Sequence, residues 1–224
     1  SPDPHSGDLL QQPNGGFATV LARLLLVHAQ RAVAMQQQQR TAAEPRERTG
    51  GRAERHTRRE AESETVTSFY LVPEDGGALP TYRPGQSLGF VLDLPDRMTP
   101  VIRTYTISDS PKDACHYRLS IKREPAPADQ PDLPPGVSSN YFHDHVQVGT
   151  KLQVRAPSGQ FALRPGGKGP VLLLSGGVGC TPMIAMLNAI VDAGSTRNVW
   201  FVHGVRNGRE HAFLQEGLSR RRYR

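Results

Sequence analysis

The sequence predicts two parts in series, a small antiparallel β-barrel followed by a parallel α/β unit. From residue 65 onward, short segments alternate apolar and polar side chains between glycine and proline residues, a pattern typical of short-stranded barrels. Residues 171–174 form a continuous apolar run, which predicts a buried parallel strand, and a glycine-rich turn follows directly. A second apolar run, at residues 199–204, predicts the neighbouring strand. The barrel therefore precedes the α/β unit along the chain.

The barrel strands are expected where the alternation is clearest. The expected strands are residues 65–72, 87–93, 101–108, 117–122 and 151–156. A single helix, at residues 138–146, is expected among them. Residues 53–60 carry many charged side chains without apolar alternation, so we assign them to a linker rather than to a first barrel strand.

The α/β unit is expected to contain one clear helix after its glycine turn. We expect Thr181 to cap this helix, Pro182 to lie in its first turn and Gly194 to end it. A bare backbone at the turn would let a phosphate approach the N–H groups and the positive dipole end of the helix. The turn reads Gly-Gly-x-Gly rather than the full dinucleotide motif, so a connection that binds nothing is an equally good interpretation.

The chain before the barrel differs in composition. Residues 1–60 are expected to be disordered or of low complexity, apart from one helix with a broad apolar stripe at residues 17–35. The barrel is expected to occupy residues 61–165 and the α/β domain residues 166–224.

The basic residues of the chain do not indicate a nucleic-acid partner. Lys and Arg number 27 against 21 Asp and Glu, a net charge of +6, and four of the last five residues are arginines. No recognition motif or aromatic stacking pattern accompanies these basic residues, so we expect no nucleic-acid binding. A basic interaction protein stays open as an alternative that only the arginine runs support.

The apolar run at residues 21–27 is too short to span a bilayer, and we expect no membrane partner.

Cys115 and Cys180 are the only cysteines. Two are too few for a disulfide framework or a metal knuckle, so no metal site is expected, and a reducing cytoplasm fits this usage. Cys180 directly follows the glycine turn, where the helix dipole can lower the pKa of a thiol. An inert packing cysteine is the alternative.

One tetrapeptide within an expected strand combines side chains that suit a phosphate and a flat ring. It reads Arg103-Thr104-Tyr105-Thr106, with the arginine and tyrosine on one face and the two threonines on the other. An arginine suits a phosphate, a tyrosine ring can stack on a heterocycle, and a threonine hydroxyl can bond a ring nitrogen. The alternative is a surface arginine among ordinary strand residues.

A second motif opens the helix of the barrel. Gly136, Ser138 and Ser139 lie where backbone N–H groups and a hydroxyl could meet a second phosphate. A plain helix cap is the alternative.

The three motifs in this order are far more specific than any one of them. They read Arg-x-Tyr-Thr at 103–106, Gly-x-x-Ser at 136–139 and Gly-Gly-x-Gly-x-Thr-Pro at 176–182. The sequence resembles the reductase module of the ferredoxin–NADP reductase superfamily, and within it the flavohaemoglobins, which are bacterial and fungal nitric oxide dioxygenases. The likeness runs from about residue 62 to residue 218. Its supporting stretches are residues 67–86, 101–111, 117–124, 138–149, 156–161, 175–183 and 199–213.

The resemblance implies an FAD-binding barrel and an NAD(P)H-binding α/β domain, with a role for each motif. Arg103 would bind the FAD pyrophosphate, with Thr104 beside it. Tyr105 would pack on the isoalloxazine and Thr106 would bond near its reactive nitrogen, which makes these two the candidate catalytic residues. Gly136, Ser138 and Ser139 would hold the pyrophosphate at the helix start. The nicotinamide nucleotide would lie on Gly176, Gly177, Val178, Gly179, Cys180 and Thr181.

The resemblance also implies an activity. In a complete relative, electrons pass from NADH through FAD to a haem, which converts nitric oxide and dioxygen to nitrate. The helix at residues 17–35 resembles the last helix of the globin that holds this haem. The rest of the globin has no counterpart here, and neither does the family's C-terminal nucleotide motif, so we expect a chain that is incomplete at both ends. Ser87 also replaces a family tyrosine after Pro84-Gly85-Gln86. A stand-alone flavin or ferric reductase and an inactive truncated fragment stay open, and so do both NADH and NADPH.

Overall fold

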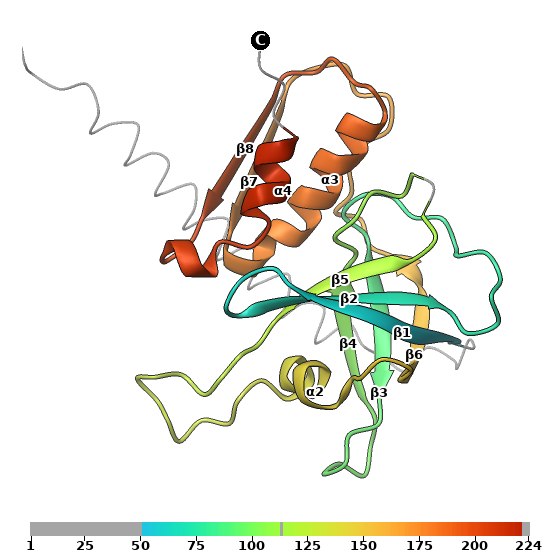
Figure 1. Cartoon of the computed structure of the whole chain (residues 1–224), viewed down its shortest axis with the longest axis vertical. Helices are drawn as coiled ribbons and strands as arrows, with labels where there is room; N and C mark the ends of the chain where they lie inside the picture. The colour runs from blue at the N-terminus through green and yellow to red at the C-terminus, as the bar shows by residue number, and fades with distance from the viewer. Residues whose placement is uncertain (1–50, 113, 221–224) are drawn as a thin grey trace, which may run out of the picture. The chain divides into compact units, whose positions relative to one another are not determined.

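The computed structural model describes residues 51–112 and 114–220. The predicted helix at residues 17–35 and most of the predicted N-terminal segment lie outside these ranges. Within them, the predicted fold class is confirmed: a six-stranded antiparallel sheet precedes a short parallel α/β part (Figure 1).

The sheet closes on itself. Its strands are β1 Arg52–Ala61, β2 Val66–Pro73, β3 Ser87–Leu92, β4 Val101–Thr106, β5 Tyr117–Lys122 and β6 Lys151–Ser158. They lie in the order β4-β3-β6-β1-β2-β5, and an antiparallel bridge between Ile107 and Leu119 joins the two outer strands. The one α-helix described between β5 and β6 is α2, Val137–His145. The five predicted strands and this helix are confirmed to within two residues at each end.

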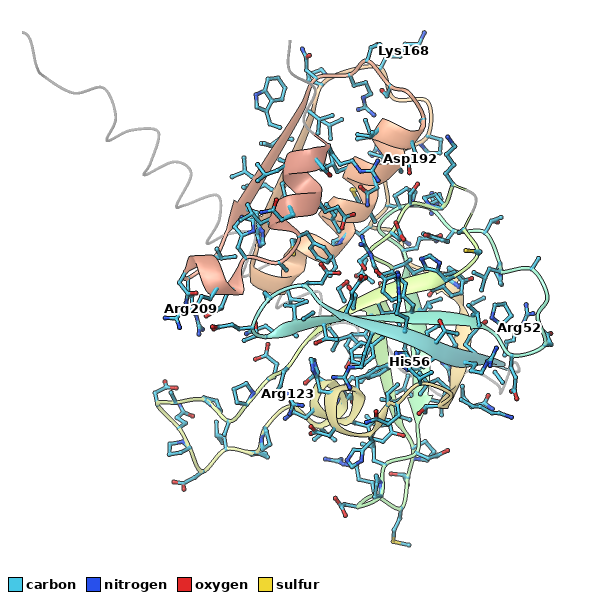
Figure 2. The ribbon with its side chains drawn as sticks, in the orientation of Figure 1. Arg52, His56, Arg123, Lys168, Asp192 and Arg209 are labelled. Atoms are coloured by element: carbon cyan, nitrogen blue, oxygen red, sulfur yellow. The ribbon has the colours of Figure 1, made fainter. Side chains whose placement is uncertain are left out.

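The assignment of residues 53–60 to a linker is wrong. These residues form most of β1, which pairs with β2 from Glu54 to Ala61 and with β6 from Arg52 to Arg55. The inward positions of β1 are polar, because Glu54 is 2 % exposed and His56 0 % exposed. A shift of register between His56 and Arg58 then changes the phase of the strand. Figure 2 labels His56 among the strands of the sheet. Apolar alternation, the signal used to find strands, is therefore absent from a real strand.

Aromatic side chains from several elements fill the barrel around one phenylalanine. Phe142 of α2 is fully buried. Its ring centroid lies 5.5 Å from that of Phe69, 5.3 Å from Phe90 and 5.2 Å from Tyr105. The edge-to-face angles of these pairs, 70–87°, are those that aromatic quadrupoles favour. Phe142 thus packs α2 against the strand that carries the Arg-x-Tyr-Thr motif.

The α/β part is a pair of parallel strands with two helices. Its elements are β7 Val171–Gly176, η1 Gly177–Cys180, α3 Thr181–Asp192, β8 Val199–Gly204, η2 Gly208–Glu210 and α4 Leu214–Ser219. Figure 1 shows α3 and α4 on the same side of β7 and β8. Buried Leu173, Ile184 and Phe213 belong to one apolar cluster that also includes Val66 of the barrel.

The ends of α3 agree with the predicted signals except at the cap. Pro182 lies in the first turn, as predicted. Gly194 has a φ of +64°, and the N–H groups of Gly194 and Ser195 donate to the carbonyls of Val191 and Ile190, which is a Schellman ending. The prediction that Thr181 caps the helix is wrong. The 3₁₀ turn makes Thr181 the first helical residue, and its hydroxyl donates to the carbonyl of Val178 at 3.2 Å.

None of the helices among the described residues is long and apolar enough to cross a membrane. The same residues contain no group of three or more His, Cys, Asp or Glu side chains placed to hold a metal ion.

Candidate functional site

The Arg-x-Tyr-Thr motif forms most of β4, paired with β3. Arg103 stands opposite Phe90 and Tyr105 opposite Leu88, so both lie on the face of the sheet that carries the buried core residues. The Tyr105 ring packs against Phe142, and burial raises the pKa of Tyr105 to about 12 although Arg103 opposes the rise. The tyrosine therefore presents a neutral hydroxyl at neutral pH.

Arg103 has no carboxylate partner among the described residues. Its side chain is exposed, and Nη1 donates only to the carbonyl of Ile102, at 2.8 Å. An exposed guanidinium without an ion pair can bind a phosphate in a bidentate manner without first breaking an ion pair with a carboxylate.

The two threonines lie on the opposite face. Thr104 stands opposite Gly89, and Thr106 stands opposite Ser87, with 3.4 Å between their hydroxyl oxygens. The serine that replaces the family's tyrosine thus lies directly beside Thr106. The two hydroxyls form one small polar patch at the end of the motif.

The start of α2 offers one buried hydroxyl without a partner. Ser138 is 4 % exposed, and its Oγ makes no hydrogen bond within the described residues. Ser139 Oγ donates to the carbonyl of Gly136 at 3.3 Å. An added Cβ at Gly136 would lie 2.5 Å from that Oγ, so only glycine fits. The N–H of Gly136 already donates to Glu124 at 2.9 Å. Gly136 therefore shapes the helix start, and its N–H is not free for a ligand.

The glycine turn at the end of β7 is open. Gly176, Gly177 and Gly179 are exposed, and an added Cβ at Gly177 or Gly179 would meet no atom within 4 Å. Gly177 has a φ of +51°, which favours glycine. The turn therefore leaves its backbone accessible at the start of α3, as nucleotide binding requires.

His203, which the sequence motifs did not identify, holds this turn from the neighbouring strand. Its Nε2 donates to the carbonyl of Gly177 at 3.0 Å, and its ring lies 4.7 Å from that of His211. Burial, helped by His211, lowers the pKa of His203 against the opposing effect of the Gly177 carbonyl. The carboxyl ends of parallel strands share one edge, and this rule could have located His203 from its position late in the second apolar run.

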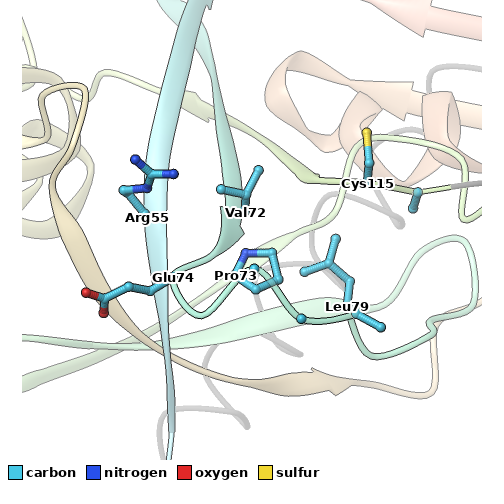
Figure 3. Close-up of a pocket in the computed structure, with 10 residues that line it drawn as sticks. Arg55, Val72, Pro73, Glu74, Leu79 and Cys115 are labelled. Carbon is cyan, nitrogen blue, oxygen red and sulfur yellow. The ribbon is translucent and has the colours of Figure 1, made fainter.

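Two hollows among the described residues do not coincide with the motifs. Figure 3 shows a pocket of about 320 Å³ whose lining includes Arg55, Glu74, Leu79 and Cys115. A groove of about 1060 Å³ lies along β8 between α3 and α4. Neither is lined by Arg103, Tyr105 or the glycine turn. The predicted cofactor residues Arg103 and Tyr105 and the glycine turn therefore lie outside both hollows.

The two cysteines are expected to differ sharply in reactivity. Cys115 is exposed, whereas Cys180 is 1 % exposed and burial raises its pKa to about 12, so it is a packing residue. Because the thiolate is the nucleophile, we expect iodoacetamide to label Cys115 at least ~100-fold faster than Cys180. Mass spectrometry of the labelled peptides measures both rates in one sample, and urea-unfolded protein, in which the rates should converge, is the control. Equal rates in the folded chain would contradict the burial of Cys180.

Comparisons with known proteins agree with this arrangement. A family model for the oxidoreductase FAD-binding domain matches residues 57–163, and one for the oxidoreductase NAD-binding domain matches residues 173–222. The FAD/NAD-binding domain of a nitric oxide dioxygenase from Vibrio cholerae is 36% identical, with a TM-score of 0.69 over 76% of this chain and 69% of that one. The chain belongs to the flavohaemoprotein reductase family.

Curated flavohaemoproteins extend well beyond the matched region. That of Halalkalibacterium halodurans is 43% identical over 69% of this chain and 37% of its own length, and that of Deinococcus radiodurans 44% over 72% and 38%. The chain thus matches only the reductase part of these relatives. The fold alone is shared with phthalate dioxygenase reductase, which is 24% identical with a TM-score of 0.62. The resemblance to flavohaemoglobin reductases is confirmed; the domain boundaries at 60/61 and 165/166 stay predictions.

The domains imply FAD and NAD(P)H, and the residues present fit the flavin. A phosphate needs a cation and unengaged donors, and the chain offers the unpaired guanidinium of Arg103 and the unpartnered hydroxyl of Ser138. A flat ring needs an apolar wall, which the half-buried ring of Tyr105 provides.

Proposed function

We propose that this chain is the FAD-dependent NAD(P)H oxidoreductase module of a flavohaemoglobin-type nitric oxide dioxygenase. FAD supplies the step between a two-electron nucleotide donor and a one-electron acceptor. In this proposal the electrons go on to the haem of a globin, where nitric oxide and dioxygen become nitrate. The observation that carries the proposal is the Arg103 guanidinium, free of any acid among the described residues, beside the half-buried Tyr105 ring on one strand.

Each predicted site residue keeps a role in this proposal. Arg103 neutralises the pyrophosphate and Thr104 borders it, while Tyr105 and Thr106 position the isoalloxazine by packing and hydrogen bonding. At the start of α2, Ser138 and Ser139 offer hydroxyls and Gly136 allows the close approach. The residues proposed to receive the nicotinamide nucleotide, NADH or NADPH, are Gly176, Gly177, Val178, Gly179, Cys180 and Thr181. Of these, Cys180 contributes through its backbone, because its thiol is buried.

Other destinations for the electrons are conceivable. A stand-alone flavin or ferric reductase is the second candidate function, and the fold shared with phthalate dioxygenase reductase does not by itself choose between the acceptors. A reducing cytoplasm is the proposed location, supported by two free thiols.

Arg103→Ala is expected to weaken FAD binding. A charge-assisted hydrogen bond contributes about 1.5–3 kcal/mol, so affinity should fall roughly 10- to 100-fold. Titration of the flavin-free chain with FAD, followed by flavin fluorescence, measures the effect. Arg97→Ala is the matched control, because Arg97 is an exposed arginine between β3 and β4, outside the motif.

Unchanged FAD affinity in Arg103→Ala would remove Arg103 from the site. With FAD bound, reduction by NADH or NADPH separates an active reductase from an inactive fragment. Electron transfer to a separately supplied globin, compared with transfer to ferric citrate, then separates the two candidate acceptors.

A further inference from the structure

An ion pair between a buried arginine and a partly buried glutamate joins the barrel to the α/β part. Arg118 on β5 is 7 % exposed. Its Nη1 and Nη2 donate to the two carboxylate oxygens of Glu216 on α4 at 2.8 and 3.0 Å. Burial disfavours the charged guanidinium, but the hydrogen bonds and charge of Glu216 outweigh this effect and raise the pKa of Arg118. The pair is bidentate, which fixes the orientation of the two side chains as well as the distance between them.

The pair also contacts a neighbour of each cofactor motif. Arg118 Nη2 donates to the carbonyl of Ser108 at 2.5 Å, two residues after Thr106 in the flavin motif. Glu216 Oε1 accepts from Asn188 Nδ2 at 2.6 Å, and Asn188 lies on α3, the helix that begins at the glycine turn. One ion pair thus connects the strand proposed to hold the flavin to the helix proposed to hold the nucleotide.

The surroundings of the pair are tightly constrained. The Phe213 ring lies 5.2 Å from the guanidinium carbon of Arg118 and is 4 % exposed. Phe213 has a φ of +59°, a conformation that a bulky residue adopts only where the surroundings hold it. Arg118 Nε is buried without a partner among the described residues. An apolar pair of similar volume often stabilises a fold as well as a buried ion pair does, so stability alone explains this arrangement poorly.

We propose that Arg118 and Glu216 are positioning residues for hydride transfer, holding the glycine-turn helix and the flavin strand at the separation that the reaction needs. This inference rests on the proposed function. One hydride, with its two electrons, passes from the reduced nicotinamide to the flavin and leaves the nicotinamide oxidised. Neither Arg118 nor Glu216 exchanges a proton or an electron. Reacting atoms must come within about 3–3.5 Å, and a displacement of about 1 Å can cost ~100-fold in rate.

The test compares the full chain with bound FAD against Arg118→Met, Glu216→Met and the double variant. Anaerobic rapid mixing with NADH or NADPH yields the limiting rate of flavin reduction and the dissociation constant of the nucleotide. FAD content and melting temperature are measured on the same samples. We expect the limiting rate to fall ~10- to 100-fold in all three variants, with the dissociation constant and FAD content within about threefold of the unsubstituted chain.

The double variant decides between positioning and mere stability. Removing both charges should restore the melting temperature lost in the single variants, because no unpaired charge stays buried, but it should not restore the rate. Lys151→Met, which removes an ion pair with Glu74 on the barrel surface, should leave the rate unchanged.

Each remaining outcome counts against the inference. An unsubstituted rate in the double variant, or loss of FAD from it, overturns the positioning role alone. Failure of both NADH and NADPH to reduce the flavin of the unsubstituted chain overturns the proposed function, and this inference with it.

Discussion

Replacing Phe142 with alanine is expected to lower the free energy of unfolding by about 3–5 kcal/mol, the range for a fully buried phenylalanine. The Phe142 side chain is 0 % exposed and contacts four aromatic rings, so the surrounding structure cannot close the cavity without moving several of them. One of the four is the ring of Tyr105. Because the flavin is proposed to pack on Tyr105, FAD should also be retained poorly at temperatures where the variant is still folded.

Urea unfolding followed by circular dichroism measures the stability, and fluorescence of released flavin measures the retention. Phe142→Leu is the graded control, since it keeps an apolar group of intermediate size and should lose about 1–1.5 kcal/mol. A loss below about 1 kcal/mol for Phe142→Ala would mean that the cavity collapses and that Phe142 does not organise the core. If Phe142→Ala loses the expected stability but retains FAD as the unsubstituted chain does, then Phe142 supports the core and does not support the flavin site.

Local patterns were enough to predict most of the fold. Alternation located β2 to β6 because their inward residues are apolar, and a continuous apolar run located β7 and β8. Only β1 was missed, because its buried positions hold Glu54 and His56 and its register shifts midway. The order of polar and apolar residues predicts a strand only when its buried positions hold apolar residues, and the buried positions of β1 hold polar ones.

The candidate site also has features that the sequence predicts and features that it does not. Its motifs are short and lie at a strand end, a helix start and a turn, so each could be identified from neighbouring residues. The Arg118–Glu216 pair could not, because 98 residues separate its partners and only folding brings them together. The Gly136 N–H is a second example, because it donates to the carbonyl of Glu124, which lies on a different segment. Sequence patterns predict which residues can bind, whereas tertiary contacts decide which donors stay free.

Glu54 is expected to make the protein less stable as the pH rises. The carboxyl is 2 % exposed, and Oε2 has no hydrogen-bond partner within the described residues. Burial, reinforced by Asp75 and opposed by Arg52, raises the pKa of Glu54 from its ordinary value of 4.5 to about 7. Between these two values the folded chain keeps a proton that the unfolded chain releases. Stability from this group is therefore fully present below about pH 4.5 and is lost as the pH rises through about 7.

Glu54→Gln should remove this dependence, because a neutral amide of the same shape replaces a buried charge. One pKa unit corresponds to about 1.36 kcal/mol, so the variant should exceed the unsubstituted chain by about 3 kcal/mol at about pH 8 and match it near pH 4.5. Chemical denaturation across this pH range gives the difference, in which the titration of all other groups cancels. Glu64→Gln is the control, since Glu64 is exposed and forms only a surface ion pair with Arg209, expected to contribute about 0–1 kcal/mol. A difference between Glu54→Gln and the unsubstituted chain that stays constant with pH would mean that Glu54 reaches water when ionised, and that the inward polar face of β1 is hydrated.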